Sequence, residues 1–177
     1  MRIIAGVNKG RGLKAPKWGG LRPTSDKLRE TLFNIIAPDV VDARVLDVFA
    51  GTGAVALEAL SRGAEAATCI EQDRRAVQLI ETNRALCGEE NRCAIIRDAA
   101  ERALARPIPG GPFDIIVLDP PYDYAALAAV VGAAAGQRRP GAVLVLEHAS
   151  RVPPPIADGL IVTRTVKSGD SALSFYA

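Results

Sequence analysis

The stretch that decides the fold is Val45-Leu46-Asp47-Val48-Phe49-Ala50-Gly51-Thr52-Gly53. Its apolar residues predict a buried strand over residues 44–49. The small residues at its end predict a tight turn, and residues 54–62 are expected to form a helix. A strand that passes through a glycine-rich turn into a helix is typical of nucleotide sites. Glycines let the backbone approach a ligand, and the helix N-terminus presents free N–H groups to it.

The chain continues to alternate strands and helices after this stretch. Strands are predicted over residues 66–71, 92–97, 113–118 and 142–147, and helices over 73–87, 99–105 and 123–135. A turn is expected at 138–141, and strands 159–166 and 171–176 should pair as an antiparallel hairpin. Because the earlier strands are continuously apolar, we expect an α/β, Rossmann-like fold. It would be a mostly parallel seven-stranded sheet with helices on both faces.

The N-terminal segment differs from the rest in charge. Residues 1–30 contain eight Lys or Arg and two acidic residues, although the net charge of the whole chain is only +2. A basic arm on a mildly acidic body favours a polyanionic partner such as nucleic acid. We therefore divide the chain into a basic extension, residues 1–37, and a catalytic domain, residues 38–177.

This extension is expected to contain a hairpin and a helix. Residues 2–7 and 12–16 predict a β-hairpin whose loop carries Lys9 and Arg11. A helix is then expected from residue 24 or 25 to residue 36, where Pro38 would end it.

Composition limits the cellular setting. No apolar run reaches the roughly 18 residues needed to span a bilayer, and the N-terminus has no signal-peptide pattern. The three cysteines, Cys69, Cys87 and Cys93, have no metal-like spacing. We therefore expect a cytoplasmic protein with reduced thiols, no metal and no membrane partner, and we expect a monomer.

Acidic residues recur at the ends of the predicted parallel strands. Asp47, Glu71, Asp98, Asp119 and Glu147 each end or follow one of the five strands. In open α/β sheets, ligands bind at the carboxyl ends of the strands. We therefore expect these carboxylates to surround one site.

Two cofactors compete for the glycine turn. Gly51-x-Gly53-x-x-Ala56 matches the dinucleotide fingerprint, and Glu71 lies 20 residues after Gly51, which leaves NAD as an alternative. The carboxylate of Asp47, however, opposes a pyrophosphate and suits a cation. S-adenosylmethionine has a sulfonium, an α-ammonium and no phosphate, so we favour it. Glu71 would then accept from the ribose hydroxyls, and Asp98 with Ala99 would lie beside adenine.

The predicted cofactor-binding residues are Asp47, Phe49, Ala50, Gly51, Thr52, Gly53, Glu71, Gln72, Asp98 and Ala99.

Asp119-Pro120-Pro121-Tyr122 is the candidate catalytic segment. An amino group conjugated to a base is a poor nucleophile because its lone pair is delocalised. The Asp119 carboxylate and the Pro120 carbonyl can accept from its N–H groups and favour the geometry that attacks a methyl group. Proline fixes the backbone there. Tyr122 can stack on a base turned out of its strand.

These motifs resemble a known family. Asp47-Val-Phe-Ala-Gly-Thr-Gly with Asp119-Pro-Pro-Tyr is similar to class I amino-methyltransferases. The N-terminal Met1-Arg-Ile-Ile-Ala-Gly, the segments that begin at Leu21 and Leu57, and Gly169-Asp-Ser-Ala-Leu-Ser-Phe-Tyr resemble the bacterial RsmD-type 16S ribosomal RNA guanine-N2 methyltransferases. The resemblance extends over the whole chain.

The resemblance implies methyl transfer from S-adenosylmethionine to the N2 amine of one guanine in 16S rRNA, within the assembled small ribosomal subunit, with S-adenosylhomocysteine as product. It implies catalytic roles for Asp119, Pro120 and Tyr122. The predicted RNA-contacting residues are Lys9, Arg11, Arg22, Thr24, Arg29 and Pro121. Alternatives are an adenine-N6 methyltransferase acting on DNA or RNA, an NAD-dependent oxidoreductase, and a non-catalytic RNA-binding assembly factor.

Overall fold

The structure is a computed structural model that describes residues 1–19 and 25–177. Its described residues form one seven-stranded sheet in the order β3-β2-β1-β4-β5-β7-β6. The bounds are β1 Arg44–Val48, β2 Ala66–Ile70, β3 Cys93–Ile96, β4 Phe113–Leu118, β5 Arg138–Ala149, β6 Val162–Ser168 and β7 Ser171–Tyr176. The first five strands are parallel, and β7 is antiparallel to both β5 and β6. The predicted Rossmann-like architecture is confirmed.

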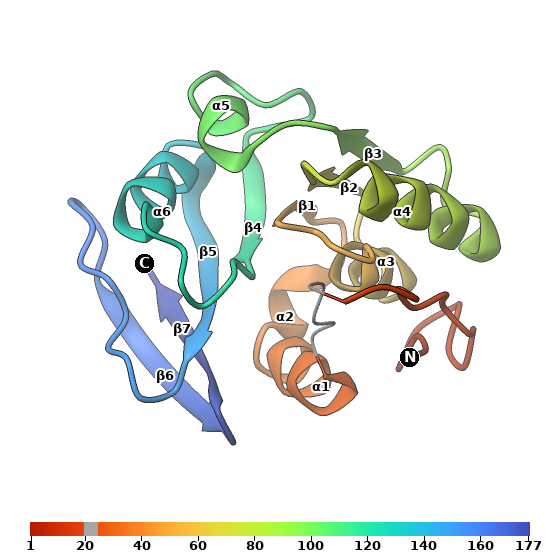
Figure 1. Cartoon of the computed structure of the whole chain (residues 1–177), viewed down its shortest axis with the longest axis horizontal. Helices are drawn as coiled ribbons and strands as arrows, with labels where there is room; N and C mark the ends of the chain where they lie inside the picture. Colours follow the sequence, from red (N-terminus) through yellow and green to blue (C-terminus); the bar gives the residue numbers. More distant parts are fainter. Residues whose placement is uncertain (20–24) are drawn as a thin grey trace.

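Helices cover both faces of this sheet (Figure 1). They are α1 Asp26–Ile35, α2 Ala37–Val40, α3 Ala54–Ser61, α4 Arg74–Cys87, α5 Ala100–Leu104 and α6 Leu127–Ala135. The strand side chains alternate between two cores. Val45 packs with α1, α3 and α4, whereas Leu46 and Val48 pack with α5 and α6. Both faces of β1 are therefore buried, which explains its continuous apolar run.

Local sequence signals set the ends of several helices. The Ser25 side chain accepts from the Leu28 N–H and starts α1, and Asp73 caps α4 in the same way. Pro38 does not simply end α1, because it lies in the first turn of α2, where a missing N–H costs no hydrogen bond.

The N-terminal arm, residues 1–19, folds back as a shorter hairpin than predicted. Its backbone hydrogen bonds run from Ile3 N–H to the Arg11 carbonyl, from Gly10 N–H to the Ile3 carbonyl and from Leu13 N–H to the Met1 carbonyl. Its described residues contain one isolated antiparallel bridge, between Arg2 and Gly12. The backbone N–H groups of Ile4 and Ala5 donate to the Glu58 carboxylate at 2.8 and 3.0 Å. Because α3 takes these donors, the pairing within the arm is confined to residues 1–3 and 10–13.

Close packing of the arm on α3 also explains Gly6. It has a φ of +82°, and a Cβ there would lie 1.7 Å from the Ser61 carbonyl oxygen. Only glycine allows this approach. The sequence pattern therefore identified the arm correctly as a folded-back segment, but not the helix that holds it.

The turn predicted at residues 138–141 is also wrong, because β5 begins at Arg138 and includes these residues. The register between β4 and β5 shifts between Phe113 and Ile115. Such an irregularity accommodates Pro140 and Gly141 within a strand.

Arg29 is buried, which corrects the prediction that it contacts RNA. Its side chain is 0% exposed, and its Nε lies 3.7 Å from Oε2 of Glu58, which is also 0% exposed. It donates to the Arg2 carbonyl and to Asp26. The guanidinium of Arg29 therefore interacts with groups inside the protein and links α1 to the arm and to α3.

We predict that Arg29→Ala destabilises the protein by about 3 kcal/mol, because it leaves the Glu58 charge without one of its buried partners. Urea unfolding measures this change. Lys27→Ala, on the exposed side of the same helix, is the control and should change stability by less than about 0.5 kcal/mol. Unaltered stability of Arg29→Ala together with weaker RNA binding would restore the surface role.

Candidate active site

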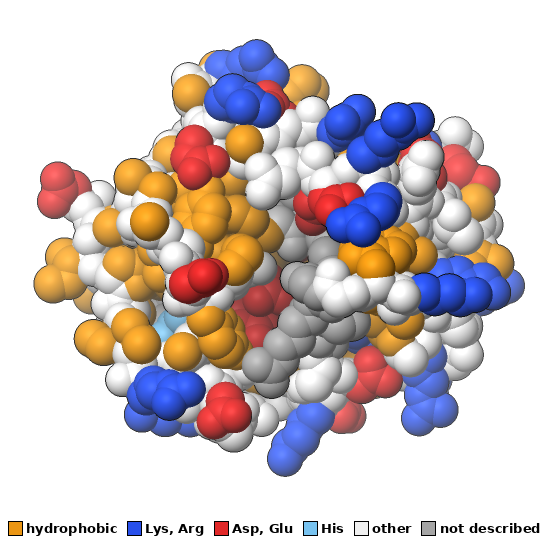
Figure 2. All heavy atoms as spheres, viewed as in Figure 1, with side chains coloured by type: hydrophobic (Ala, Val, Ile, Leu, Met, Phe, Trp, Pro, Cys, Tyr) orange, Lys and Arg blue, Asp and Glu red, His pale blue; other side chains and the backbone are white. Residues whose placement is uncertain are grey.

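A cavity of about 780 Å³ opens at the carboxyl edge of the sheet. Figure 2 shows acidic side chains deep in a hollow near the middle of this face. The loop between β6 and β7 also contributes to the cavity wall. Twelve predicted site residues line it: Asp47, Phe49, Ala50, Gly51, Thr52, Glu71, Gln72, Asp98, Asp119, Pro120, Pro121 and Tyr122. The fold thus brings the predicted cofactor and catalytic segments to one place.

Asp47 lies buried beneath the glycine turn and is 1% exposed. Its Oδ2 accepts a hydrogen bond from the Ala56 N–H of α3 at 3.2 Å. Burial raises the pKa of Asp47 to about 8, and the charges of Asp119 and Glu71 add to the rise. A positively charged group bound beside Asp47 would favour the ionised carboxylate and reverse part of this shift.

The glycine turn is held by Glu71 from the neighbouring strand end. The two carboxylate oxygens of Glu71 accept from the N–H groups of Gly51 and Asp73 at 2.9 and 2.8 Å. Gly53 has a φ of +74°, and a Cβ there would lie 3.0 Å from Ile80. The turn therefore needs glycine for both its conformation and its packing on α4.

The charge of the cavity favours a cationic ligand over a pyrophosphate. Asp47, Glu71, Asp119 and Glu147 all line it. The hydrogen bond from Ala56 to Asp47 also occupies one of the N–H groups at the start of α3, which a dinucleotide site would offer to phosphate. These carboxylate acceptors fit S-adenosylmethionine, which is cationic and has no phosphate.

Asp98 lies at the adenine side of the predicted site and is paired with arginines. Arg102 lies 2.7 Å from its Oδ1 and Arg106 lies 3.6 Å from its Oδ2. The hydrogen bond from Arg102 is the main cause that holds the pKa of Asp98 below its usual value. Two predicted cofactor residues, Gly53 and Ala99, are not among the cavity-lining residues that the structure describes.

The catalytic segment follows β4 directly. The Asp119 N–H donates to the Val48 carbonyl at 3.3 Å, which ties the segment to the end of β1. Pro120 is buried. Tyr122 is 43% exposed, and its hydroxyl lies 2.6 Å from Ser171 Oγ in the hairpin that closes the sheet.

The predicted RNA-contacting residues do not all lie in one part of the structure. Lys9 and Arg11 are exposed on the arm, and Pro121 is exposed at the cavity. Lys and Arg side chains are visible around the rim of the face in Figure 2. Arg22 and Thr24 lie outside the described residues.

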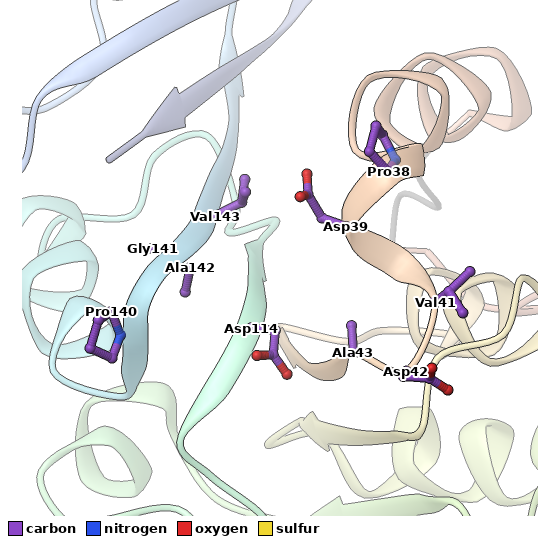
Figure 3. Close-up of a pocket in the computed structure, with 10 residues that line it drawn as sticks. All are labelled: Pro38, Asp39, Val41, Asp42, Ala43, Asp114, Pro140, Gly141, Ala142 and Val143. Carbon is purple, nitrogen blue, oxygen red and sulfur yellow. The ribbon is translucent and has the colours of Figure 1, made fainter.

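A second cavity, of about 300 Å³, lies at the amino ends of the parallel strands (Figure 3). Asp114 at the start of β4 is its central carboxylate, and it accepts from the Arg44 N–H at 2.7 Å and from Arg139 at 3.0 Å. These contacts join β1, β4 and β5 at this end. The cavity lies away from the residues predicted to bind a cofactor.

Comparison with known proteins identifies the family. The family model described as "Conserved hypothetical protein 95" matches residues 1–177. The Escherichia coli (strain K12) "Ribosomal RNA small subunit methyltransferase D" is 48% identical over 122 residues, which cover 69% of this chain and 60% of that protein. The Bacillus subtilis "Putative rRNA methyltransferase YlbH" is 36% identical over 99% of this chain and 98% of its own length. The chain belongs to the RsmD-type methyltransferase family.

Solved structures agree with this assignment. The structure of "Putative methyltransferase yhhF from Escherichia coli" superposes with a TM-score of 0.87 at 36% identity, over 99% of this chain and 96% of that one. A Salinibacter ruber RNA methyltransferase, solved with S-adenosyl-L-homocysteine, has a TM-score of 0.69 at 14% identity over 87% of this chain and 92% of that one. The second likeness concerns the fold alone. The resemblance to the RsmD type is confirmed.

Several residues of the cavity were not predicted as site residues of this family member. Trp18 of the arm and Arg75 of α4 both line it, with the guanidinium 5.0 Å from the ring centre. Tyr124 packs edge-on against Phe49, with ring centres 4.9 Å apart. Trp18 was visible as an isolated aromatic residue in a glycine-rich loop, but nothing in the sequence paired it with Arg75.

The described ranges, 1–19 and 25–177, contain neither a cluster of metal ligands nor a membrane-spanning helix. Within these ranges, no three His, Cys, Asp or Glu side chains are grouped so that they could hold a metal ion. No helix in the same ranges has the length and apolar character required to cross a bilayer.

We predict that Asp47 makes the stability of this RsmD-type protein depend on pH. Because its folded pKa of about 8 lies above the ordinary value of about 3.9, the folded state binds the proton more tightly than the unfolded chain. The resulting stabilisation is full below about pH 4 and is lost as the pH rises through about 8.

Urea unfolding of the wild type and Asp47→Asn at several pH values tests this prediction. The free energy of unfolding of Asp47→Asn, relative to that of the wild type, should increase between pH 5 and pH 8.5 by the order of a few kcal/mol. A difference that does not change with pH would contradict the burial-driven shift.

Proposed function

We propose that the chain transfers a methyl group from S-adenosylmethionine to the exocyclic N2 amine of a guanine in 16S rRNA of the small ribosomal subunit. The observation that carries the proposal is the acid-lined cavity, which joins the glycine turn to Asp119-Pro120-Pro121-Tyr122. The names of the E. coli and B. subtilis relatives, both rRNA methyltransferases, support the substrate class. The cell compartment is then the cytoplasm, where these subunits are assembled.

The cofactor would lie along the ends of β1, β2 and β3. Asp47 would be close to its cationic end, Phe49 to Gly53 would face it through the turn, and Glu71 would accept from its ribose hydroxyls. Each Glu71 oxygen already accepts one backbone N–H, and each can accept a further hydrogen bond. Gln72, Asp98 and Ala99 would surround the adenine. When bound, S-adenosylmethionine supplies a methyl group attached to its sulfonium. Loss of the methyl group turns the sulfonium into the neutral thioether of S-adenosylhomocysteine.

The guanine would enter beside the end of β4, turned out of its stack. Tyr122 would stack on the ring, while Asp119 and the Pro120 carbonyl would accept from the N2 amine and direct its lone pair to the methyl carbon. The new C–N bond would form as the S–C bond breaks with its electrons to sulfur, and the N2 amine would release one proton to Asp119 or to water. Positioning and electrostatics supply the rate enhancement, without a covalent enzyme intermediate.

Residues 1–37 would be the RNA-contacting extension of a methyltransferase domain over residues 38–177. Lys9 and Arg11 are exposed on an arm that hydrogen bonds fix to α3, among them Val7 N–H to the Ser61 carbonyl at 2.8 Å and Asn8 N–H to Ser61 Oγ at 3.0 Å. The arm would therefore present its charges in a fixed relation to the cavity. Arg22 and Thr24, from the segment outside the described residues, complete the proposed set.

The proposal is tested by incubating small ribosomal subunits from a strain that lacks this activity with the protein and S-adenosylmethionine. Mass spectrometry of the digested RNA should find N2-methylguanosine at one mapped position. N6-methyladenosine would instead indicate the adenine-N6 alternative. Absence of transfer, together with tight NAD binding and no S-adenosylmethionine binding, would overturn the proposal.

We predict that Asp119→Ala lowers kcat by about 10²–10³-fold and leaves S-adenosylmethionine affinity within a few fold, because it removes an acceptor aimed at the amine. Single-turnover methylation and calorimetric binding measure the two quantities. Asp119→Asn separates two roles, since an amide oxygen still accepts a hydrogen bond but cannot take a proton. Near-normal turnover of Asp119→Asn would exclude an obligatory base, and full activity of Asp119→Ala would remove Asp119 from the mechanism.

We predict that Lys9→Ala/Arg11→Ala weakens binding to the small subunit and reduces the slope of log K against log salt by about 1–2, because two phosphate contacts are lost. A filter-binding titration at several salt concentrations measures the slope. Arg151→Ala/Arg164→Ala removes the same charge from exposed positions in the C-terminal part and is the matched control. Equal effects of the two double variants would show a general charge effect rather than a binding arm.

A further inference from the structure

The end of β5 places a fifth strand-end acid, Glu147, in the cavity beside the catalytic segment. The structure pairs Leu118 of β4 with Leu146 of β5. The next residues of the two strands, Asp119 and Glu147, therefore lie next to each other at the same edge. Both line the cavity, and Glu147 is only 7% exposed. Neither the cofactor side nor the methyl-transfer step described above uses Glu147.

Glu147 lies on a strand that is paired with β7. It pairs in register with Leu173 of β7, and the preceding residue, Leu146, is the last that pairs with β4. The next residue, His148, is buried, and its Nε2 lies 2.8 Å from Ser174 Oγ. A carboxylate on such a rigid element can read hydrogen-bond donors with good geometric selectivity.

The Watson–Crick edges of the two candidate bases differ next to the reactive amine. In guanine, the N2 amine lies beside N1–H, so two donors are adjacent. In adenine, the N6 amine lies beside N1 with a lone pair, so a donor and an acceptor are adjacent. A second carboxylate, next to the one that accepts from the amine, can accept the N1–H of guanine. With adenine, the same carboxylate would face the N1 lone pair, so two acceptors would meet without a proton between them and away from water.

We propose that Glu147 is the residue that selects guanine, by accepting the N1–H of the target base while Asp119 accepts from its N2 amine. The inference rests on the guanine-N2 transfer proposed above and adds a specificity residue to it. It explains why this chain would act on guanine rather than on adenine.

The test compares guanine with 2-aminopurine at the mapped target position. 2-Aminopurine keeps the reactive 2-amino group but lacks O6 and has a lone pair at N1 in place of the N1–H. The loss of O6 is common to the wild type and the variants, so the comparison between enzymes isolates the effect at N1. Small subunits are reconstituted on 16S rRNA ligated from fragments, one of which carries either base. The measured quantity is the ratio of kcat/KM for the two substrates, which cancels any general loss of active enzyme.

We expect the wild type to prefer guanine by about 10²-fold or more, since a site that binds a donor rejects the analogue that lacks it. In Glu147→Gln, the side-chain amide can donate to the N1 lone pair. The ratio should then fall to within about tenfold of unity, as in a double-mutant cycle between Glu147 and N1–H. Glu81→Gln, an exposed site on α4, makes the same chemical change and should keep the wild-type ratio.

Three results would overturn the inference. They are an unchanged ratio in Glu147→Gln, an equal fall in Glu81→Gln, and loss of turnover on both substrates while S-adenosylmethionine binding and melting temperature stay normal. Failure of the wild type to methylate guanine N2 at all would instead refute the proposed function. The two failures are therefore distinguishable.

Discussion

The buried carboxylate of Glu58 joins three parts of the chain that the site depends on. It accepts from the N–H groups of Ile4 and Ala5 in the arm, lies 3.7 Å from Arg29 of α1, and accepts from Arg62 at 2.7 Å at the end of its own helix. A carboxylate without exposure to water requires such partners, since an unpaired charge there would be strongly destabilising. Because α3 begins at the glycine turn, this interaction also fixes the basic arm relative to the cavity.

The acids at the strand ends share a location but have different surroundings, and this difference gives them different tasks. Asp47 is desolvated and accepts from the Ala56 N–H of α3. Burial raises its pKa, so a cation bound beside it would favour the ionised carboxylate. Glu71 accepts from the backbone of the glycine turn, and Asp98 forms ion pairs with Arg102 and Arg106. Asp119 and Glu147 remain at the side of the cavity where a base would enter. In the proposed function, the cavity would therefore combine a cation site and an amine site along one edge of the sheet.

The sequence predicted the sheet and the contents of the cavity well, because apolar strand runs and the residues that follow them are local signals. It failed where a residue's surroundings depend on distant partners. Arg29 looked like a surface cation, yet Glu58 and the Arg2 carbonyl bury it. The hairpin of the arm is shorter than predicted, and beyond residue 3 the backbone donates to Glu58 of α3 instead. The contact of Trp18 with Arg75 joins segments that no periodicity connects.

The central claim is that the glycine turn and the acids around it orient a cationic methyl donor towards the end of β4. A crystal structure of the protein with S-adenosylhomocysteine tests it most directly. We expect the amino-acid end of the ligand beside Asp47, its ribose hydroxyls at Glu71, and its sulfur facing Asp119. A ligand bound in the reverse orientation, or outside this cavity, would contradict the account.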